Sequence, residues 1–155
     1  MNSLPALVEV QIIAIAEEVF ASMVDGEPGR LVPWTGGPVN LADPLHAWVE
    51  MNVELGGRVL LTTDAGTADD LARALLGMDA GEPVSEADLV DAFGEVANVV
   101  GGNLKALLPV QGKLTIPAVS RQSPSAAGAV PIDEVALAWR GCPLVISVWM
   151  IEKEG

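Results

Sequence analysis

The chain has 155 residues, of which half are hydrophobic, and its 21 acidic side chains outnumber the 8 basic ones to give a net charge of −13. This length and apolar content predict a single folded domain over residues 1–155 and argue against intrinsic disorder. The negative charge argues against nucleic acid and anionic membrane as partners, although acidic chains are often acidic for solubility alone.

The first predicted element is a long N-terminal helix. Ser3 suits its N-cap and Gly26 its end, and apolar residues recur between them at helical spacing: Val8, Ile12, Ile15, Val19 and Met23. No basic region precedes this apolar run, and no stretch of about 18 uncharged apolar residues occurs, so we predict a cytoplasmic protein with no signal peptide and no membrane insertion. Residues 26–44 are rich in proline and predict a loop with a short edge strand at 31–34.

The next segment predicts a β-hairpin followed by a short helix. Polar and apolar side chains alternate through much of residues 46–63, and Gly56 and Gly57 are a signal for the turn between the two strands. Thr67 and the aspartate three positions later form a capping-box pattern. This pattern predicts a short helix that begins there and ends near Gly77.

A second long helix is predicted from Ser85 to Leu108, with Ser85 as its N-cap and Pro109 as its stop. Its apolar residues recur at helical spacing and form one stripe: Leu89, Phe93, Val96, Ala97, Val100, Leu104 and Leu107. Three strands are expected after it, at 113–119, 130–139 and 143–151. This order of helices and strands predicts an α+β fold, in which long helices pack on one face of a largely antiparallel sheet.

The residue types that usually carry enzyme chemistry are sparse. Cys142 and His46 are the only cysteine and histidine, which excludes an intrachain disulfide and a multi-histidine or thiolate metal site and disfavours a catalytic triad. We expect both to be packing residues. The sequence contains no glycine-rich phosphate loop. Asp64, Asp69 and Asp70 could hold a hard cation, but favourable charge and capping at a helix N-terminus explain them better.

The polar face of the second long helix is unusual. Glu95 and Asn98 lie about 60° apart, roughly opposite the apolar stripe, and Gly94 and Gly102 flank them. A glycine inside a helix costs about 1 kcal/mol relative to alanine. We therefore interpret these glycines as bare backbone that another macromolecule approaches closely. A glutamate and an asparagine three positions apart are by themselves a weak pattern, which any exposed helix can carry.

The fuller pattern is E-x-x-N-x-x-x-G-N-x-K over residues 95–105. It resembles the signature helix of the CheX-type chemotaxis phosphatases, which belong with the CheC and FliY proteins that dephosphorylate CheY-like response regulators. The likeness extends to the V-F-x-x-M string at 19–23, T-I-P-A-V at 115–119 and P-L-V-I-S-V-W-M at 143–150. CheC-like proteins carry an ExxN motif on both long helices. Here Glu17 and Glu18 have no asparagine three positions later, so one site is expected.

The resemblance implies a CheC/CheX-like fold, an activity and a partner. The partner is a phosphorylated CheY-like response regulator, whose aspartyl phosphate is hydrolysed. Asn98 would orient the attacking water and Glu95 would pair with the regulator's active-site lysine. Gly94, Gly102 and Asn103 are expected where the partner approaches. The Mg²⁺ belongs to the regulator, so no metal or cofactor of the chain's own is expected, and a homodimer through the sheet is implied.

Two other classes of function remain open at this point. A non-catalytic CheX-like interaction module would keep the fold and bind a response regulator or a flagellar switch component. The intact pair of Glu95 and Asn98 favours the phosphatase, because a pure adaptor has no need of both. A small-molecule enzyme has almost no support, since the chain offers no histidine-based or multi-carboxylate constellation.

Overall fold

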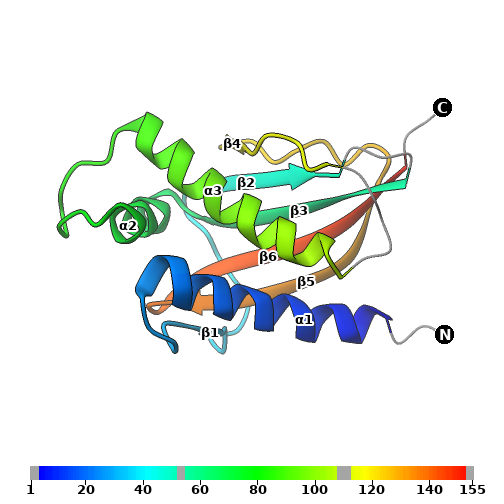
Figure 1. The fold of residues 1–155 in the computed structure, drawn as a ribbon, viewed down its shortest axis with the longest axis horizontal. Helices are drawn as coiled ribbons and strands as arrows, with labels where there is room; N and C mark the ends of the chain where they lie inside the picture. Colours follow the sequence, from blue (N-terminus) through cyan, green and yellow to red (C-terminus); the bar gives the residue numbers. More distant parts are fainter. Residues whose placement is uncertain (1–3, 52–54, 108–112, 153–155) are drawn as a thin grey trace.

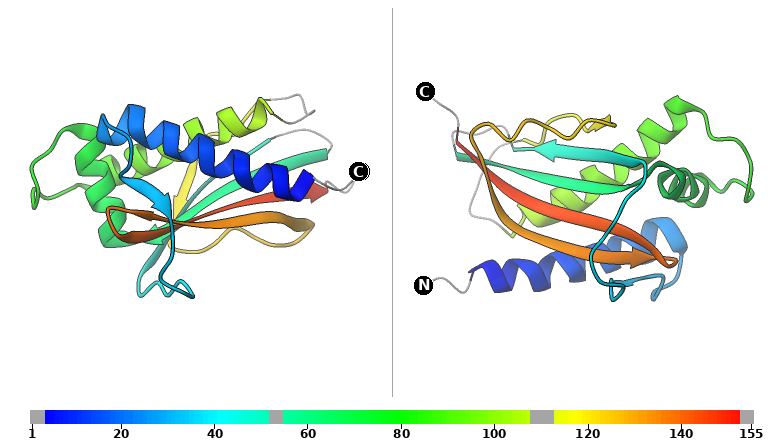
Figure 2. Two further views of the ribbon diagram at one scale, coloured as in Figure 1. Left: turned by 90° about the horizontal axis from the view of Figure 1, so that it is seen from below. Right: turned by 180° about the vertical axis from the view of Figure 1, so that it is seen from behind.

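Six antiparallel strands form one sheet, and the helices cover one of its faces (Figures 1 and 2). This computed structural model describes residues 4–51, 55–107 and 113–152. The strands are β1 (Leu31–Pro33), β2 (Pro44–Glu50), β3 (Leu55–Asp64), β4 (Ala118–Ser120), β5 (Ala129–Trp139) and β6 (Cys142–Glu152), and they lie in the order β1-β5-β6-β3-β2-β4. The helices are α1 (Leu4–Val19), η1 (Phe20–Asp25, a π-helix), α2 (Ala65–Leu76) and α3 (Glu86–Lys105). The predicted α+β class is confirmed. No helix in the described part of the chain is long and apolar enough to cross a membrane.

The first helix continues without a break into η1 and ends where it was predicted to end. Gly26 follows η1 with a left-handed φ of 72°, a conformation that glycine adopts without strain. Asp25, the last residue of η1, has a side chain that is only 1% exposed. It accepts hydrogen bonds from Trp139 Nε1 at 3.1 Å and from the Arg140 guanidinium at 2.8 Å. These bonds attach the end of the helix to the turn between β5 and β6.

The β2–β3 hairpin is confirmed, but its glycines are not the turn. Gly56 and Gly57 lie inside β3, where they pair with Ile151 and Met150 of β6. A β-carbon at Gly57 would lie 2.6 Å from Met51 Cε. Glycine is therefore used here to make room for a packed side chain, a function that the local pattern does not distinguish from a turn.

The N-cap of the short helix α2 lies three residues earlier than its capping-box pattern predicts. Asp64, with extended backbone, occupies the N-cap position, whereas Thr67 is buried inside the helix. The Thr67 pattern was therefore wrong as a start signal, because its side chain faces the core instead of the orphan amides. The end at Gly77 is confirmed, with a φ of 69°. The Asp64 carboxylate accepts a hydrogen bond from the Asp43 amide at 2.8 Å.

The C-terminal hairpin forms as expected, with Arg140 and Gly141 at its turn in left-handed conformation. The strand expected at 113–119 is largely replaced by irregular backbone. Leu114 forms an isolated bridge to Met51, and regular pairing with β2 is confined to β4. Pro117 lies between these two stretches and has no amide hydrogen to donate to a ladder.

Helix α3 packs on the half of the sheet formed by β3, β2 and β4. Ser85 is its N-cap, as expected, and its side chain accepts a hydrogen bond from the Asp88 amide at 3.1 Å. The helix ends at Lys105, and the expected stop at Leu108 and Pro109 lies outside the described residues. Most of the predicted stripe is buried, namely Phe93, Val96, Ala97, Val100 and Leu104. A β-carbon at Gly101 would overlap Val49 Cγ2 of β2, so the helix backbone lies directly on the strand.

This close contact predicts that Gly101→Ala is destabilising, although alanine is the better helix former. Overpacking costs about 1–3 kcal/mol and the helix propensity of alanine returns about 1 kcal/mol, so we expect a net loss of about 1 kcal/mol. Gly66→Ala in α2 is the matched control, because no atom of the described residues lies within 4 Å of a β-carbon there. Urea denaturation of both variants tests the contact. Equal stability of the two would contradict it.

Candidate functional site

Glu95 and Asn98 project from the same face of α3, one turn apart. Asn98 Nδ2 donates a hydrogen bond to Glu95 Oε1 at 3.4 Å. The Glu95 side chain is exposed, while Asn98 is half-buried. The sequence placed both in open solvent, and Asn98 differs because it forms part of the wall of a groove.

The groove has a volume of about 380 Å³ and two walls. One wall is the outer face of α3, and the other is the segment that leads into β4. The residues that line it are Val90, Asp91, Gly94, Glu95, Asn98, Ile116 and Pro117. The groove therefore combines two carboxylates and a carboxamide with an apolar side, and no basic side chain among the described residues lines it.

The two glycines beside the pair differ in what surrounds them. A β-carbon at Gly94 would lie 3.2 Å from Pro117 Cβ, so the missing side chain lets the proline approach the helix. Gly94 lines the groove, but it is buried. Its missing side chain therefore makes room for Pro117 of the same chain and not for a partner. Of the residues that the structure describes, a β-carbon at Gly102 would meet Leu114 Cδ1 alone, at an ordinary 3.8 Å. The backbone at Gly102 is therefore less closely packed than at Gly94.

Asn103 does not join Glu95 and Asn98. Its Nδ2 donates to the Val99 carbonyl at 2.8 Å, one turn back in the same helix. Together with Val99 it lines a separate hollow against α1, formed with Ile15, Glu18, Val19 and Ser22. At about 100° per residue, five positions turn Asn103 about 140° away from Asn98.

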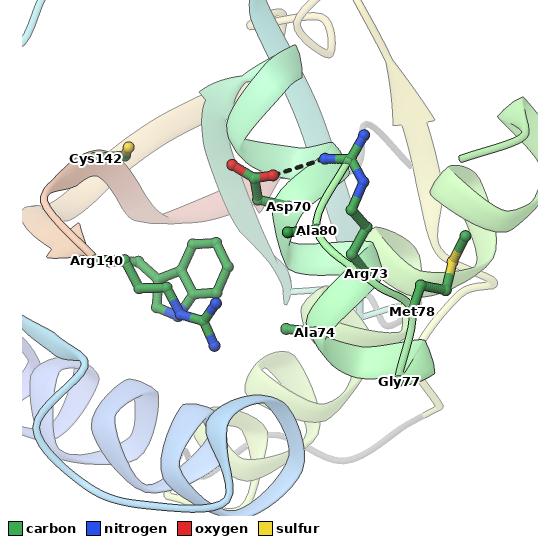
Figure 3. Close-up of a pocket in the computed structure, with 9 residues that line it drawn as sticks. Asp70, Arg73, Ala74, Gly77, Met78, Ala80, Arg140 and Cys142 are labelled. Carbon is green, nitrogen blue, oxygen red and sulfur yellow. Dashed lines mark hydrogen bonds and ion pairs between the residues drawn. The ribbon is translucent and has the colours of Figure 1, made fainter. Parts of the chain in front are cut away.

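A hollow of about 410 Å³ lies between α2 and the β5–β6 turn, and it shares no residue with the groove (Figure 3). Asp70 and Arg73 form an ion pair there at 2.7 Å, and the Arg140 guanidinium lies 4.6 Å from the centre of the Trp139 ring. Both arginines are already paired with carboxylates. Cys142 lines this hollow as a half-buried free thiol.

The three aspartates considered as cation ligands do not converge on one point. Asp70 pairs with Arg73, and Asp64 accepts from the Asp43 amide. In residues 4–51, 55–107 and 113–152, no group of three or more histidine, cysteine, aspartate or glutamate side chains is arranged to hold a metal ion. Asp64 occupies the N-cap position of α2 without a side-chain capping hydrogen bond, and the first turn of α2 contains no acidic residue, so the expected capping and first-turn charge do not explain the three aspartates.

Four residues of the groove were not predicted from the sequence, namely Val90, Asp91, Ile116 and Pro117. Asp91 lies one turn before Glu95 on the same helix face, so helical spacing alone could have identified it. Ile116 and Pro117 come from a different segment, and only the folded chain brings them to α3. No local signal in the sequence connects the two segments.

Comparison with known proteins gives one family and a set of similar folds. The sequence model of the family described as chemotaxis phosphatase CheX matches residues 46–130. None of the curated proteins matches the chain at a significant level. The chemotaxis protein CheX from Vibrio vulnificus has a similar structure, with a TM-score of 0.67, 18% identity, and coverage of 97% of this chain and 99% of that chain.

Two complexes contain further similar chains. The CheX–CheY–BeF3–Mg²⁺ complex from Borrelia burgdorferi gives a TM-score of 0.64 at 16% identity, covering 92% of this chain and 96% of that chain. The FliM–SpeE complex from H. pylori gives a TM-score of 0.60 at 16% identity, covering 97% of this chain and 90% of that chain. The expected CheC/CheX-like fold is confirmed by these likenesses.

His46 supplies a prediction about pH. Its Nδ1 lies 2.9 Å from Thr62 Oγ1, and burial lowers the pKa of the ring from its ordinary 6.5. The unfolded chain then binds the proton more readily than the folded chain, so stability is lost as pH falls below about 6.5 and levels off below the folded-state pKa. We expect His46→Gln to lose less stability than the wild type between about pH 7.5 and 5.5. Urea denaturation at both pH values measures this, and an unchanged difference would contradict it.

Proposed function

The chain belongs to the chemotaxis phosphatase CheX family, and from this premise we propose that it accelerates hydrolysis of the aspartyl phosphate on a CheY-like response regulator. The observation that carries the proposal is the pair of Glu95 and Asn98, side by side on an open groove of α3. The protein would act in the cytoplasm, on a regulator in chemotaxis or motility signalling.

The reaction requires little chemistry from the phosphatase. A water oxygen forms a bond to phosphorus, and the bond from phosphorus to the aspartyl oxygen breaks. The products are inorganic phosphate, which retains the protons of the water, and the free carboxylate of the regulator. Mg²⁺ and a lysine of the regulator would neutralise the phosphoryl oxygens. What remains is to hold the water in line with the breaking bond, which is a positioning effect.

The Asn98 side chain suits this positioning function. A carboxamide has an oxygen that accepts a hydrogen bond from the water and an NH₂ group that donates, and it carries no charge to repel the phosphoryl group. Asn98 Nδ2 points toward Glu95 Oε1 at 3.4 Å, which is a long hydrogen bond. Separating the two side chains on docking would therefore lose little.

Glu95 would be the docking residue. It is exposed at the edge of the groove, one turn from Asn98, and Asp91 adds a second carboxylate to the same surface. A lysine of the regulator's active site would form an ion pair with the Glu95 carboxylate. Gly102 would let the regulator approach the helix backbone, whereas Gly94 would contribute by letting Pro117 form the second wall of the groove. Asn103 would be only a peripheral contact, because its side-chain amide donates a hydrogen bond to the Val99 carbonyl.

The chain would need no metal or cofactor of its own. The similar complex from Borrelia burgdorferi is that of CheX with CheY, BeF3 and Mg²⁺. We propose by analogy that the Mg²⁺ of the reaction belongs to the regulator and not to this chain.

A non-catalytic module is the second candidate, and one observation favours it. A chain of the FliM–SpeE complex shares this fold, so the fold also occurs in a complex of these two proteins. The module would bind a response regulator or a flagellar switch component through the same groove. Retention of both Glu95 and Asn98 supports the phosphatase over the module.

We further propose a homodimer through the sheet. The sheet face opposite the helices has a hollow of about 390 Å³, whose lining includes Val39, Leu41, Leu60, Val145 and Trp149. Apolar surface of this kind is commonly covered in oligomers.

Asn98→Ala tests the proposed function. The variant should lose the acceleration of acyl-phosphate decay, by about 100-fold or more, while it still binds the regulator, because a positioned water contributes to the transition state and little to docking. Alanine is the better helix former, so the loss would not come from unfolding. The measurement is a time course of decay for response regulators encoded beside the gene.

The matched control for this substitution is Asn40→Ala, which removes an exposed carboxamide from the loop before β2. This variant should accelerate hydrolysis of the acyl phosphate as much as the wild type does. If Asn98→Ala is as active as the wild type, the phosphatase mechanism is wrong and the interaction module takes its place.

Glu95→Ala should act on a different step. Removing the charge partner should weaken binding to the phosphorylated regulator by about tenfold, or about 1.4 kcal/mol, and the loss should shrink at high salt. Isothermal titration with regulator carrying beryllofluoride and Mg²⁺ measures the affinity. If the variant binds as tightly as the wild type but hydrolyses the acyl phosphate more slowly, Glu95 acts in the chemical step instead of in docking.

Sedimentation velocity at micromolar concentration tests the homodimer. We expect a particle of about twice the 16.1 kDa mass of the chain, which dissociates on dilution. A single species of chain mass over the whole concentration range would contradict the dimer.

A further inference from the structure

The groove beside Glu95 and Asn98 has an apolar side that the proposed chemistry does not use. Ile116 is 89% exposed and Val90 is 38% exposed, and both line the groove together with Pro117. A single exposed aliphatic residue on a protein surface needs no explanation. Two of them in one groove, beside a candidate reaction site, form the apolar centre and polar edge that are typical of a protein interface.

The backbone on both sides of Ile116 is held in place. The Thr115 amide donates to the Glu50 carbonyl at 2.8 Å, and Thr115 Oγ1 accepts from the Glu50 amide at 2.9 Å. On the other side, Pro117 lies against Gly94 of α3. A residue that precedes proline is also restricted to extended conformations. Ile116 is therefore presented to solvent by a constrained backbone.

The side chain of Ile116 contributes almost nothing to the core. With 89% of its surface exposed, it keeps nearly all of its apolar area available for a partner. A constrained apolar side chain loses less conformational freedom on binding than one in a mobile loop. These two properties make Ile116 a docking residue and not a packing residue.

The charges around the groove restrict what can occupy it. Asp91 and Glu95 lie beside the apolar side, and within residues 4–51, 55–107 and 113–152 no arginine or lysine lines the groove. An acidic or purely apolar partner would leave these carboxylates without compensation. The partner surface must present an apolar side chain next to a basic one.

We propose that Ile116 and Val90 form the apolar docking contact for the receiver domain of the response regulator. The receiver would carry an apolar side chain beside its phosphorylated aspartate and a basic side chain that meets Asp91 and Glu95. This inference rests on the proposed function and deepens it, because it separates affinity from chemistry within one groove. Asn98 acts on the water, whereas Ile116 and Val90 select which receivers dock.

The test is Ile116→Ser, with Val90→Ser as a second variant and Val10→Ser as the matched control. Val10 is 66% exposed on α1 and does not line the groove. Rates of acyl-phosphate decay over a range of regulator concentrations give kcat and KM for each protein. We expect Ile116→Ser to raise KM about tenfold and Val90→Ser to raise it less, with kcat retained in both. Val10→Ser should match the wild type, and thermal melting should show that all variants are folded.

The outcomes separate this inference from the proposed function. If the wild type is active and Ile116→Ser has an unchanged KM, the docking contact is wrong while the phosphatase stands. A fall in kcat alone would also overturn the docking contact. If the wild type binds a beryllofluoride-loaded regulator without accelerating decay, and Ile116→Ser binds it about tenfold more weakly, the contact is supported and the phosphatase is wrong. A wild type that neither binds nor dephosphorylates any receiver overturns both.

Discussion

The close approach of α3 to β2 is the constraint on which the candidate site depends. Gly101 has no side chain at the point where the helix meets Val49, so the helix backbone lies directly on the strand. This contact buries the apolar stripe of the helix against the sheet and fixes the rotation of the helix about its axis. With that rotation fixed, Glu95 and Asn98 have one direction in which to project, which is away from the sheet and into the groove.

The second wall of the groove rests on the same strand. The side chain of Val49 packs against α3 at Gly101. The next residue, Glu50, holds the segment before β4 through two hydrogen bonds to Thr115. The contact between Pro117 and Gly94 then joins the two walls. Successive residues of a strand point in opposite directions, but their backbone positions are fixed relative to one another. The spacing between the carboxamide and the apolar side of the groove is therefore set by β2.

The distribution of charge leaves the carboxylates of the groove without a basic partner within the described part of the chain. All five arginines of the sequence form ion pairs with carboxylates elsewhere in the fold. Within the part of the chain that the structure describes, Asp91 and Glu95 have no such partner. The three pairs whose carboxylates are exposed, those of Arg30, Arg73 and Arg121, contribute little to stability. Because the arginines pair with other carboxylates, the negative charges of Asp91 and Glu95 remain available to a basic side chain of a partner.

Periodicity in the sequence determined the elements that bury a stripe or alternate along a strand. It predicted α3 and its Ser85 cap, the paired strands β5 and β6, and the proximity of Glu95 to Asn98, because each depends only on residues close in the chain. Tertiary structure decided the rest. Gly57 and Thr67 carry turn and cap signals, yet both are used for packing against residues distant in sequence. The apolar side of the groove at Ile116 was likewise undetermined, since a local pattern cannot specify which distant segment a helix face will meet.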